Sequence, residues 1–287
     1  MKVIGLLISF SLVIAEEDYC GADYSCLRQK HVFCKYKCFP GYLCKKGYPR
    51  YLTTLEKTKI LQAHNYVRDL TARNFNASNM VALEWSIELA RLAQRLVMQC
   101  FDLNVEDVCL PTKKYPNLTV ASHTFGNRYV IVKPYTLMVG WNYRLQSYFK
   151  IEPFQIPKYS PEKIGKYSEE ERRNIPYYIL INWAKVTEVG CGITLEAKKG
   201  LDSFNLLCFY QPGGNVAGEE IFKLVPDGVA SECPEGYKRG ERYGSLCVKG
   251  SEKPGPKHFE DSKICKSGVL MPVLFNVFLS LCIVFVP

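Results

Sequence analysis

Residues 183–192 read WAKVTEVGCG, and a second apolar run, FNLLCFY, follows at residues 204–210. The segments 189–195 and 204–210 are short, apolar and bounded by turn residues, a pattern typical of β-strands. Residues 177–183 have the same character and are interpreted as a further strand. Together these segments predict a small β-sheet in the second half of the chain.

Two helices are expected upstream of these strands. The first covers residues 53–71 and begins with a capping box, in which the Thr53 hydroxyl accepts from the first turn and Glu56 reaches back. The second is indicated by apolar residues that recur at three- and four-residue steps and must face a core. They are Trp85, Leu89, Leu92, Ala93, Leu96 and Cys100.

A third helix is expected over residues 136–149, with Met138, Trp141, Leu145 and Tyr148 pointing inward. Between it and the strands lies a polar segment, residues 151–176, which contains proline and is interpreted as a loop. Its charged run at residues 168–173 is interpreted as a solvated surface. Helices followed by strands predict an α+β fold, a sheet covered by helices.

Both ends of the chain are apolar. Residues 1–15 combine one lysine with an apolar run, which is typical of a secretory signal peptide. Residues 268–287 form an uncharged apolar tail that is long enough to enter a bilayer. Three interpretations of the tail stay open, in order of preference: a lipid-anchor (GPI) signal, a plain membrane span and a buried terminal helix.

The composition describes an exported globular protein. Its hydrophobic content of 47% and charged content of 23% are ordinary for folded chains. The basic residues behind the net charge of +9 are scattered, so no nucleic-acid partner is expected. Thirteen cysteines in an exported chain indicate disulfides rather than a zinc site, and no cofactor is expected. Asn76 and Asn117 begin glycosylation sequons.

Changes in cysteine content and amino-acid composition divide the mature chain into three parts. Residues 16–50 hold five cysteines and show no helical period. We therefore expect a cysteine-rich segment that needs disulfides, either within itself or to a neighbouring segment, to be stable. Residues 51–225 form the main domain. Residues 226–267 form a cysteine-containing extension among Gly, Pro and Lys residues.

Four short patterns follow one another along this chain: HNYVR at 64–68, MVALEW at 80–85, WAKVTEVGCG at 183–192 and CFYQPGGN at 208–215. Together they resemble the CAP superfamily (cysteine-rich secretory protein, antigen 5, pathogenesis-related). The leader HVFCKY at residues 31–36 resembles insect venom antigen 5-like proteins most closely. The resemblance implies an α/β/α sandwich, and it does not extend to Cys233 or beyond.

The resemblance also implies a disulfide pattern. It pairs Cys20 with Cys34, Cys26 with Cys109, Cys44 with Cys100, and Cys191 with Cys208. Cys233–Cys247 is expected from proximity in the sequence alone, which leaves Cys38 and Cys265 as the remaining pair outside the apolar tail.

At the family's metal cleft this chain departs from the pattern. Tyr177 stands where the resemblance implies a histidine, and Arg144 where it implies an acidic residue. No histidine lies between Cys100 and Cys109, a stretch that contains Glu106. His123 is the remaining cleft candidate and falls in a segment interpreted as a loop. The cleft is therefore expected to be degenerate and to bind no metal.

His64, Asn65, Arg68 and Trp183 are expected to be structural, and His64 to be a hydrogen-bonded residue on the apolar face of its helix. No hydrolase motif occurs. The sequence therefore favours a non-catalytic extracellular protein that binds a lipid, a sterol or a protein partner. An extracellular hydrolase with a rearranged cleft and a structural surface protein remain alternatives.

Overall fold

The computed structural model describes residues 19–21, 26, 29–36, 39–41, 44, 48–100, 109–125, 158–198, 201–225 and 228–250. Several sequence predictions fall outside these residues. They are the signal peptide, the helix at 136–149, the apolar tail, Cys38, Cys265, Glu106 and Arg144.

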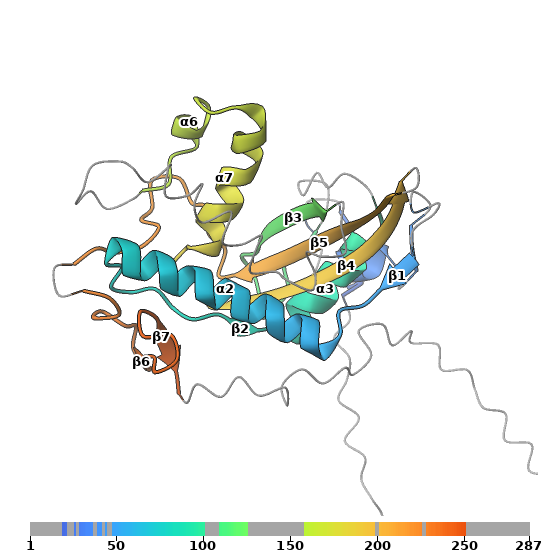
Figure 1. The fold of residues 1–287 in the computed structure, drawn as a ribbon. Coiled ribbons are helices and arrows are strands. Elements are labelled where there is room, and N and C mark those ends of the chain that lie inside the picture. Colours follow the sequence, from blue (N-terminus) through green and yellow to red (C-terminus); the bar gives the residue numbers. More distant parts are fainter. Residues whose placement is uncertain are drawn as a thin grey trace, which may run out of the picture.

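A mostly antiparallel sheet forms the centre of the fold (Figure 1). Its main strands follow the order β1-β4-β5-β3, and a short strand, β2, pairs in parallel with β4. Their bounds are Tyr48–Arg50 for β1, Glu84–Trp85 for β2, Thr119–Phe125 for β3, Glu188–Lys198 for β4 and Leu201–Gln211 for β5. The predictions of strands at 189–195 and 204–210 are confirmed, whereas β3 was not predicted.

Two helices have the caps that their sequences specify. Helix α2, Thr54–Phe75, begins with the expected capping box between Thr53 and Glu56. It runs four residues beyond the expected end, and Asn76 in the left-handed conformation closes it. Helix α3, Ile87–Val97, begins after Trp85 rather than at it, because Trp85 belongs to β2 and Ser86 forms the cap.

The prediction of a strand at residues 177–183 is wrong. Residues up to Ile181 belong to helix α7, Glu169–Ile181, which follows the short helix α6, Pro161–Ile164. A capping box between Ser168 and Glu171 starts α7 in the segment that was interpreted as a loop. A short apolar run cannot be assigned to strand or buried helix by its periodicity, which explains the error.

Helices cover both faces of the sheet, so the expected α/β/α sandwich is confirmed (Figure 1). Alternate residues of β5 point to opposite faces. Leu206, Cys208 and Tyr210 join the core under α2 and α7, and Leu207 and Phe209 join a second core under α3.

Two glycines of β4 let α3 lie directly on the sheet. A Cβ atom on Gly190 would lie 2.3 Å from the backbone nitrogen of Ala90, and one on Gly192 would lie 2.3 Å from that of Gln94. The Gln94 amide exploits this approach, because it donates to the Ile193 carbonyl and accepts from the Ile193 N–H. Any side chain at either glycine would force the layers apart.

The segments that flank the main domain are bonded to it. Five disulfides in the described residues link the cysteines that the sequence analysis paired: Cys20–Cys34, Cys26–Cys109, Cys44–Cys100, Cys191–Cys208 and Cys233–Cys247. A hairpin of β6, Tyr237–Arg239, and β7, Cys247–Lys249, lies beside the segment after α2 (Figure 1). Cys247 donates its N–H to Met80 O and accepts from the Ala82 N–H.

Candidate functional site

Tyr177 lies on α7 next to the loop that follows β5. Its half-buried ring packs against the main core. Beside it, the Asn215 amide donates to the Pro176 carbonyl at 2.9 Å, and Gly214 lies against the ring of Trp183. The position where the resemblance implies a histidine is therefore at the junction of a helix and the loop of residues 212–215.

His123 is in strand β3, which corrects its assignment to a loop. Its backbone pairs with Leu206 of β5. The other two cleft candidates, Glu106 and Arg144, lie outside the described residues. The structure thus places Tyr177 on a helix and the His123 backbone in an edge strand.

His64 lies in the core and both of its ring nitrogens have partners. Nδ1 lies 2.8 Å from the Ile60 carbonyl oxygen, and Nε2 lies 2.8 Å from the Tyr210 hydroxyl. Because a carbonyl only accepts, the proton is on Nδ1, and Nε2 accepts from Tyr210. Burial lowers the pKa of His64 to about 4, so the ring is neutral at physiological pH.

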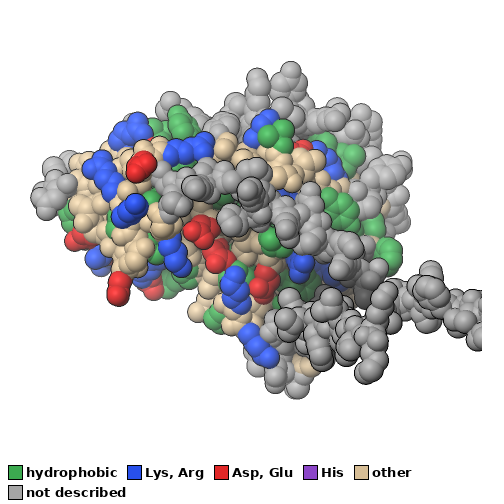
Figure 2. Space-filling view, turned by 90° about the horizontal axis from the view of Figure 1, so that it is seen from below, with side chains coloured by type: hydrophobic (Ala, Val, Ile, Leu, Met, Phe, Trp, Pro, Cys, Tyr) green, Lys and Arg blue, Asp and Glu red, His purple; other side chains and the backbone are tan. Residues whose placement is uncertain are grey.

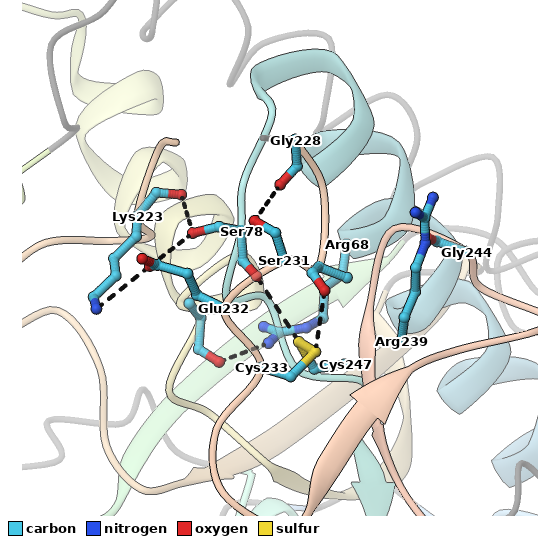
Figure 3. The surroundings of a disulfide bond; sticks show 12 residues. Arg68, Ser78, Lys223, Gly228, Ser231, Glu232, Cys233, Arg239, Gly244 and Cys247 are labelled. Carbon is cyan, nitrogen blue, oxygen red and sulfur yellow. Dashed lines mark hydrogen bonds and ion pairs between the residues drawn. A yellow bond between two sulfur atoms is a disulfide. The ribbon is translucent and has the colours of Figure 1, made fainter. Parts of the chain in front are cut away.

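Arg68 is fully buried one helical turn away, and its partners are backbone carbonyls (Figure 3). The guanidinium donates to five carbonyl oxygens, those of Val81, Ile181, Trp183, Ala184 and Val186. Burial lowers its pKa to about 9. The side chain thereby joins α2 to the segment between α7 and β4.

Asn65 and Trp183 complete this buried cluster. The Asn65 amide donates to the Leu83 carbonyl and accepts from the Leu83 N–H, so it mimics a strand partner for that residue. Trp183 is fully buried against Gly214 and Tyr159. The side chains of the first family-like motif are therefore used to hold backbone segments in place.

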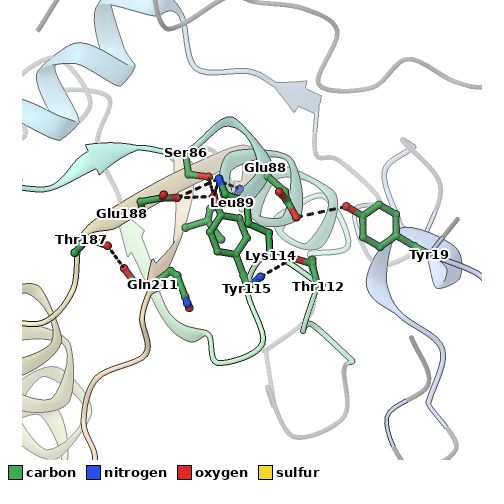
Figure 4. A network of polar contacts seen from close by, with 10 residues as sticks. All are labelled: Tyr19, Ser86, Glu88, Leu89, Thr112, Lys114, Tyr115, Thr187, Glu188 and Gln211. Atoms are coloured by element: carbon green, nitrogen blue, oxygen red, sulfur yellow. Dashed lines mark hydrogen bonds and ion pairs between the residues drawn. The ribbon is translucent and has the colours of Figure 1, made fainter. Parts of the chain in front are cut away.

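A polar network around Tyr115 was not found by sequence reasoning (Figure 4). Its hydroxyl donates to Glu188, bonds Ser86 Oγ at 2.8 Å and lies beside Lys114. Burial, followed by the bond to Glu188, raises the pKa of Tyr115. The phenol stays protonated at neutral pH, so it joins its loop to the cap of α3 and the start of β4. These residues are far apart in the chain and share no motif.

The surfaces of the described residues carry charges of both signs. On the face in Figure 2, Lys and Arg side chains are interspersed with acidic and hydrophobic ones. Both sequon asparagines, Asn76 and Asn117, are exposed. Within the described ranges, no three His, Cys, Asp or Glu side chains are grouped so that they could hold a metal ion. No helix in the described part of the chain is long and apolar enough to cross a membrane.

Comparisons with known proteins agree with the fold. The model of the cysteine-rich secretory protein family (CAP) matches residues 61–210. A venom allergen 5 from Vespula maculifrons is 31% identical over 218 residues, which cover 72% of this chain and 98% of that protein. A cysteine-rich venom protein from Tityus serrulatus is 24% identical over 261 residues, and the match covers 85% of this chain and 58% of that protein.

The solved structure of Na-ASP-1 is similar in fold. Its TM-score is 0.52 at 18% sequence identity, and the match covers 72% of this chain and 50% of that one.

Proposed function

This chain belongs to the cysteine-rich secretory protein (CAP) family, and from that premise we propose that it is an extracellular, venom-allergen-like binding protein without catalytic activity. Its ligand is a lipid, a sterol or a protein partner. The observation that carries the proposal is the environment of His64. Both nitrogens of this imidazole are hydrogen-bonded inside the core, and burial holds its pKa at about 4. Such a ring is not available as a ligand, a base or an acid at neutral pH.

The residues at the expected metal cleft support the same conclusion. Tyr177 offers a phenol, whose ordinary pKa of about 10 makes it a poor ligand at neutral pH. Arg144 offers hydrogen-bond donors and a permanent positive charge, which repels a cation. Together the two side chains suit an anionic or hydroxyl group of a ligand better than a metal ion.

The domain organisation is part of the proposal. Residues 51–225 are the binding domain, and the segments 16–50 and 226–267 are bonded to it. Two disulfides, Cys26–Cys109 and Cys44–Cys100, support this arrangement for the first segment, and the hydrogen bonds of Cys247 to Met80 and Ala82 support it for the second. The signal peptide, residues 1–15, sends the chain to the cell exterior, and the tail, residues 268–287, tethers it to the outer surface.

A ligand search on the intact protein tests the proposal. The full chain is expressed in eukaryotic secretory cells, released from the cell surface and purified. It is then incubated with lipid extract and, separately, with extracellular fluid. Captured lipids, sterols and proteins are identified by mass spectrometry. Tyr177→Ala is compared with Tyr66→Ala, a change at an exposed tyrosine of α2.

The proposal expects one ligand that is enriched by the native chain and by Tyr66→Ala and reduced by Tyr177→Ala. Turnover of an ester, a peptide or a glycan by the purified chain, lost in Tyr177→Ala, would overturn it in favour of a hydrolase. No enrichment of any ligand over a denatured control would favour a structural surface protein.

A further inference from the structure

The sequon Asn76-Ala77-Ser78 follows the last turn of α2, and its two polar side chains differ in their exposure to solvent. Asn76 is exposed and adopts the left-handed conformation, with φ of 54°. Ser78, two residues later, is fully buried. Its hydroxyl lies 3.2 Å from Glu232 Oε2 and 3.4 Å from the Lys223 carbonyl oxygen.

The backbone of the sequon is bonded as well. The Ala77 and Ser78 N–H groups donate to the carbonyls of Ala72 and Lys223, and their carbonyls accept from the N–H groups of Ala230 and Glu232. Figure 3 shows Ser78 directed toward Lys223 and Glu232, close to the Cys233–Cys247 disulfide. The backbone that covers the sequon, at Lys223 and residues 228–232, is therefore joined to the C-terminal hairpin through the Cys233–Cys247 disulfide.

N-glycosylation needs more than an exposed asparagine. The transfer forms a bond between the sugar C1 and the asparagine Nδ2 and breaks the C1–O bond to the pyrophosphate of a lipid-linked oligosaccharide. The amide proton is lost and the lipid pyrophosphate leaves. The transferase recognises the acceptor through the hydroxyl of the third residue as well as the amide, and here that hydroxyl is enclosed.

We propose that Asn76 accepts an N-linked glycan only before Lys223 and residues 228–232 dock on the sequon, so the folded protein can carry this glycan but cannot acquire it. The segment that encloses Ser78 lies far downstream, at sequence separations of 145 for Lys223 and 154 for Glu232. At roughly 5–20 residues per second, synthesis of that stretch takes on the order of 10 s. Export of the growing chain therefore leaves a period in which the sequon is open.

The second sequon provides a comparison within the same chain. Its Asn117 is exposed, and its Thr119 hydroxyl is bonded to the backbone of Gly214, 95 residues downstream. Gly213 also donates its N–H to the Asn117 carbonyl. The residues that enclose this sequon belong to the main domain, so its accessibility does not depend on the C-terminal hairpin.

In vitro glycosylation tests the proposal. The full chain is produced unglycosylated and oxidised in a bacterial periplasm, with an N-terminal Asn-Gly-Thr tag as a positive control. It is incubated with purified oligosaccharyltransferase and lipid-linked oligosaccharide, either native or reduced and alkylated. Glycan occupancy at each asparagine is measured by peptide mass spectrometry.

In the native chain we expect modification of the tag, and occupancy at Asn76 at least about tenfold below that of the alkylated chain, as a local opening free energy above ~1.4 kcal/mol implies. The double variant Cys233→Ala, Cys247→Ala frees the covering segment, so it should raise occupancy at Asn76 and leave Asn117 low. Equal occupancy of Asn76 in the native and alkylated chains would overturn the proposal. So would a double variant that stays folded by circular dichroism and leaves Asn76 as closed as in the native chain.

Discussion

The Nε2 atom of His64 lies 2.8 Å from the hydroxyl oxygen of Tyr210, although 146 residues separate the two in the chain. The bond joins α2 to β5 across the main core. Tyr210 donates, because Nδ1 of His64 is the nitrogen that carries the proton toward the Ile60 carbonyl. Burial lowers the pKa of the imidazole and raises that of the phenol, so the pair is stable in its neutral form.

Acid should destabilise the protein through His64. The folded-state pKa of about 4 is below the ordinary value of 6.5, so the unfolded chain binds a proton that the folded chain does not. The free energy of unfolding should therefore fall between pH 6.5 and 4, by on the order of 3 kcal/mol from this group. Urea unfolding of the native chain and His64→Gln at several pH values measures the effect. Identical pH slopes in the two proteins would contradict this role.

Removal of the buried guanidinium should be costly. Arg68→Met removes five hydrogen bonds to buried carbonyl oxygens, of which those of Trp183 and Ala184 keep a backbone donor, so the free energy of unfolding should fall by at least about 3 kcal/mol. Arg73→Met is the matched control on the same helix, because it removes a single ion pair, between a largely exposed guanidinium and Asp69, and should cost clearly less than Arg68→Met. If Arg68→Met is not recovered folded, Arg68→Lys is measured instead. Equal losses at positions 68 and 73 would refute the expectation.

The contact between α3 and β4 should depend on glycine. In Gly192→Ala the new methyl group meets the backbone of Gln94, which cannot move without displacing the helix, and a loss of ~3 kcal/mol or more is expected. Gly244→Ala is the control, because a Cβ there meets no atom within 4 Å. Thermal unfolding by circular dichroism compares the two. A Gly192→Ala protein as stable as the control would show that the layers can separate at little cost.

Zinc should not bind stoichiometrically with micromolar affinity. The expectation follows from the chemistry of Tyr177 and Arg144, neither of which is a suitable ligand at neutral pH. Calorimetric titration of the native chain is compared with Tyr177→His plus Arg144→Glu, which restores the residue types of the resemblance. Tight binding by the native chain that His123→Ala abolishes would reveal a functional site built on β3.

The apolar tail should tether the protein through lipid. Expressing cells are treated with phosphatidylinositol-specific phospholipase C, and the released protein is analysed by mass spectrometry. Release of a chain that lacks residues 268–287 is the expected result. A chain that stays in the membrane fraction with those residues still present would instead indicate a membrane span.

The amino-acid sequence by itself determined the local elements of this fold. The capping box of Thr53 and Glu56 lies within one helical turn, and the apolar period of α3 repeats every three or four residues. Strands β4 and β5 are adjacent in the chain, so they pair as a hairpin with Cys191 opposite Cys208. Each of these features depends on interactions at short range, which a residue pattern records directly.

Only the tertiary structure decided the remaining features. Residues 177–181 complete a helix because the core under α2 buries that face of α7, and an apolar run alone does not distinguish helix from strand. The pairing of β3 with β5, the five carbonyls around Arg68 and the burial of Ser78 join segments far apart in the chain. Such contacts depend on which surfaces are brought together after loops close, and this leaves no local signature in the sequence.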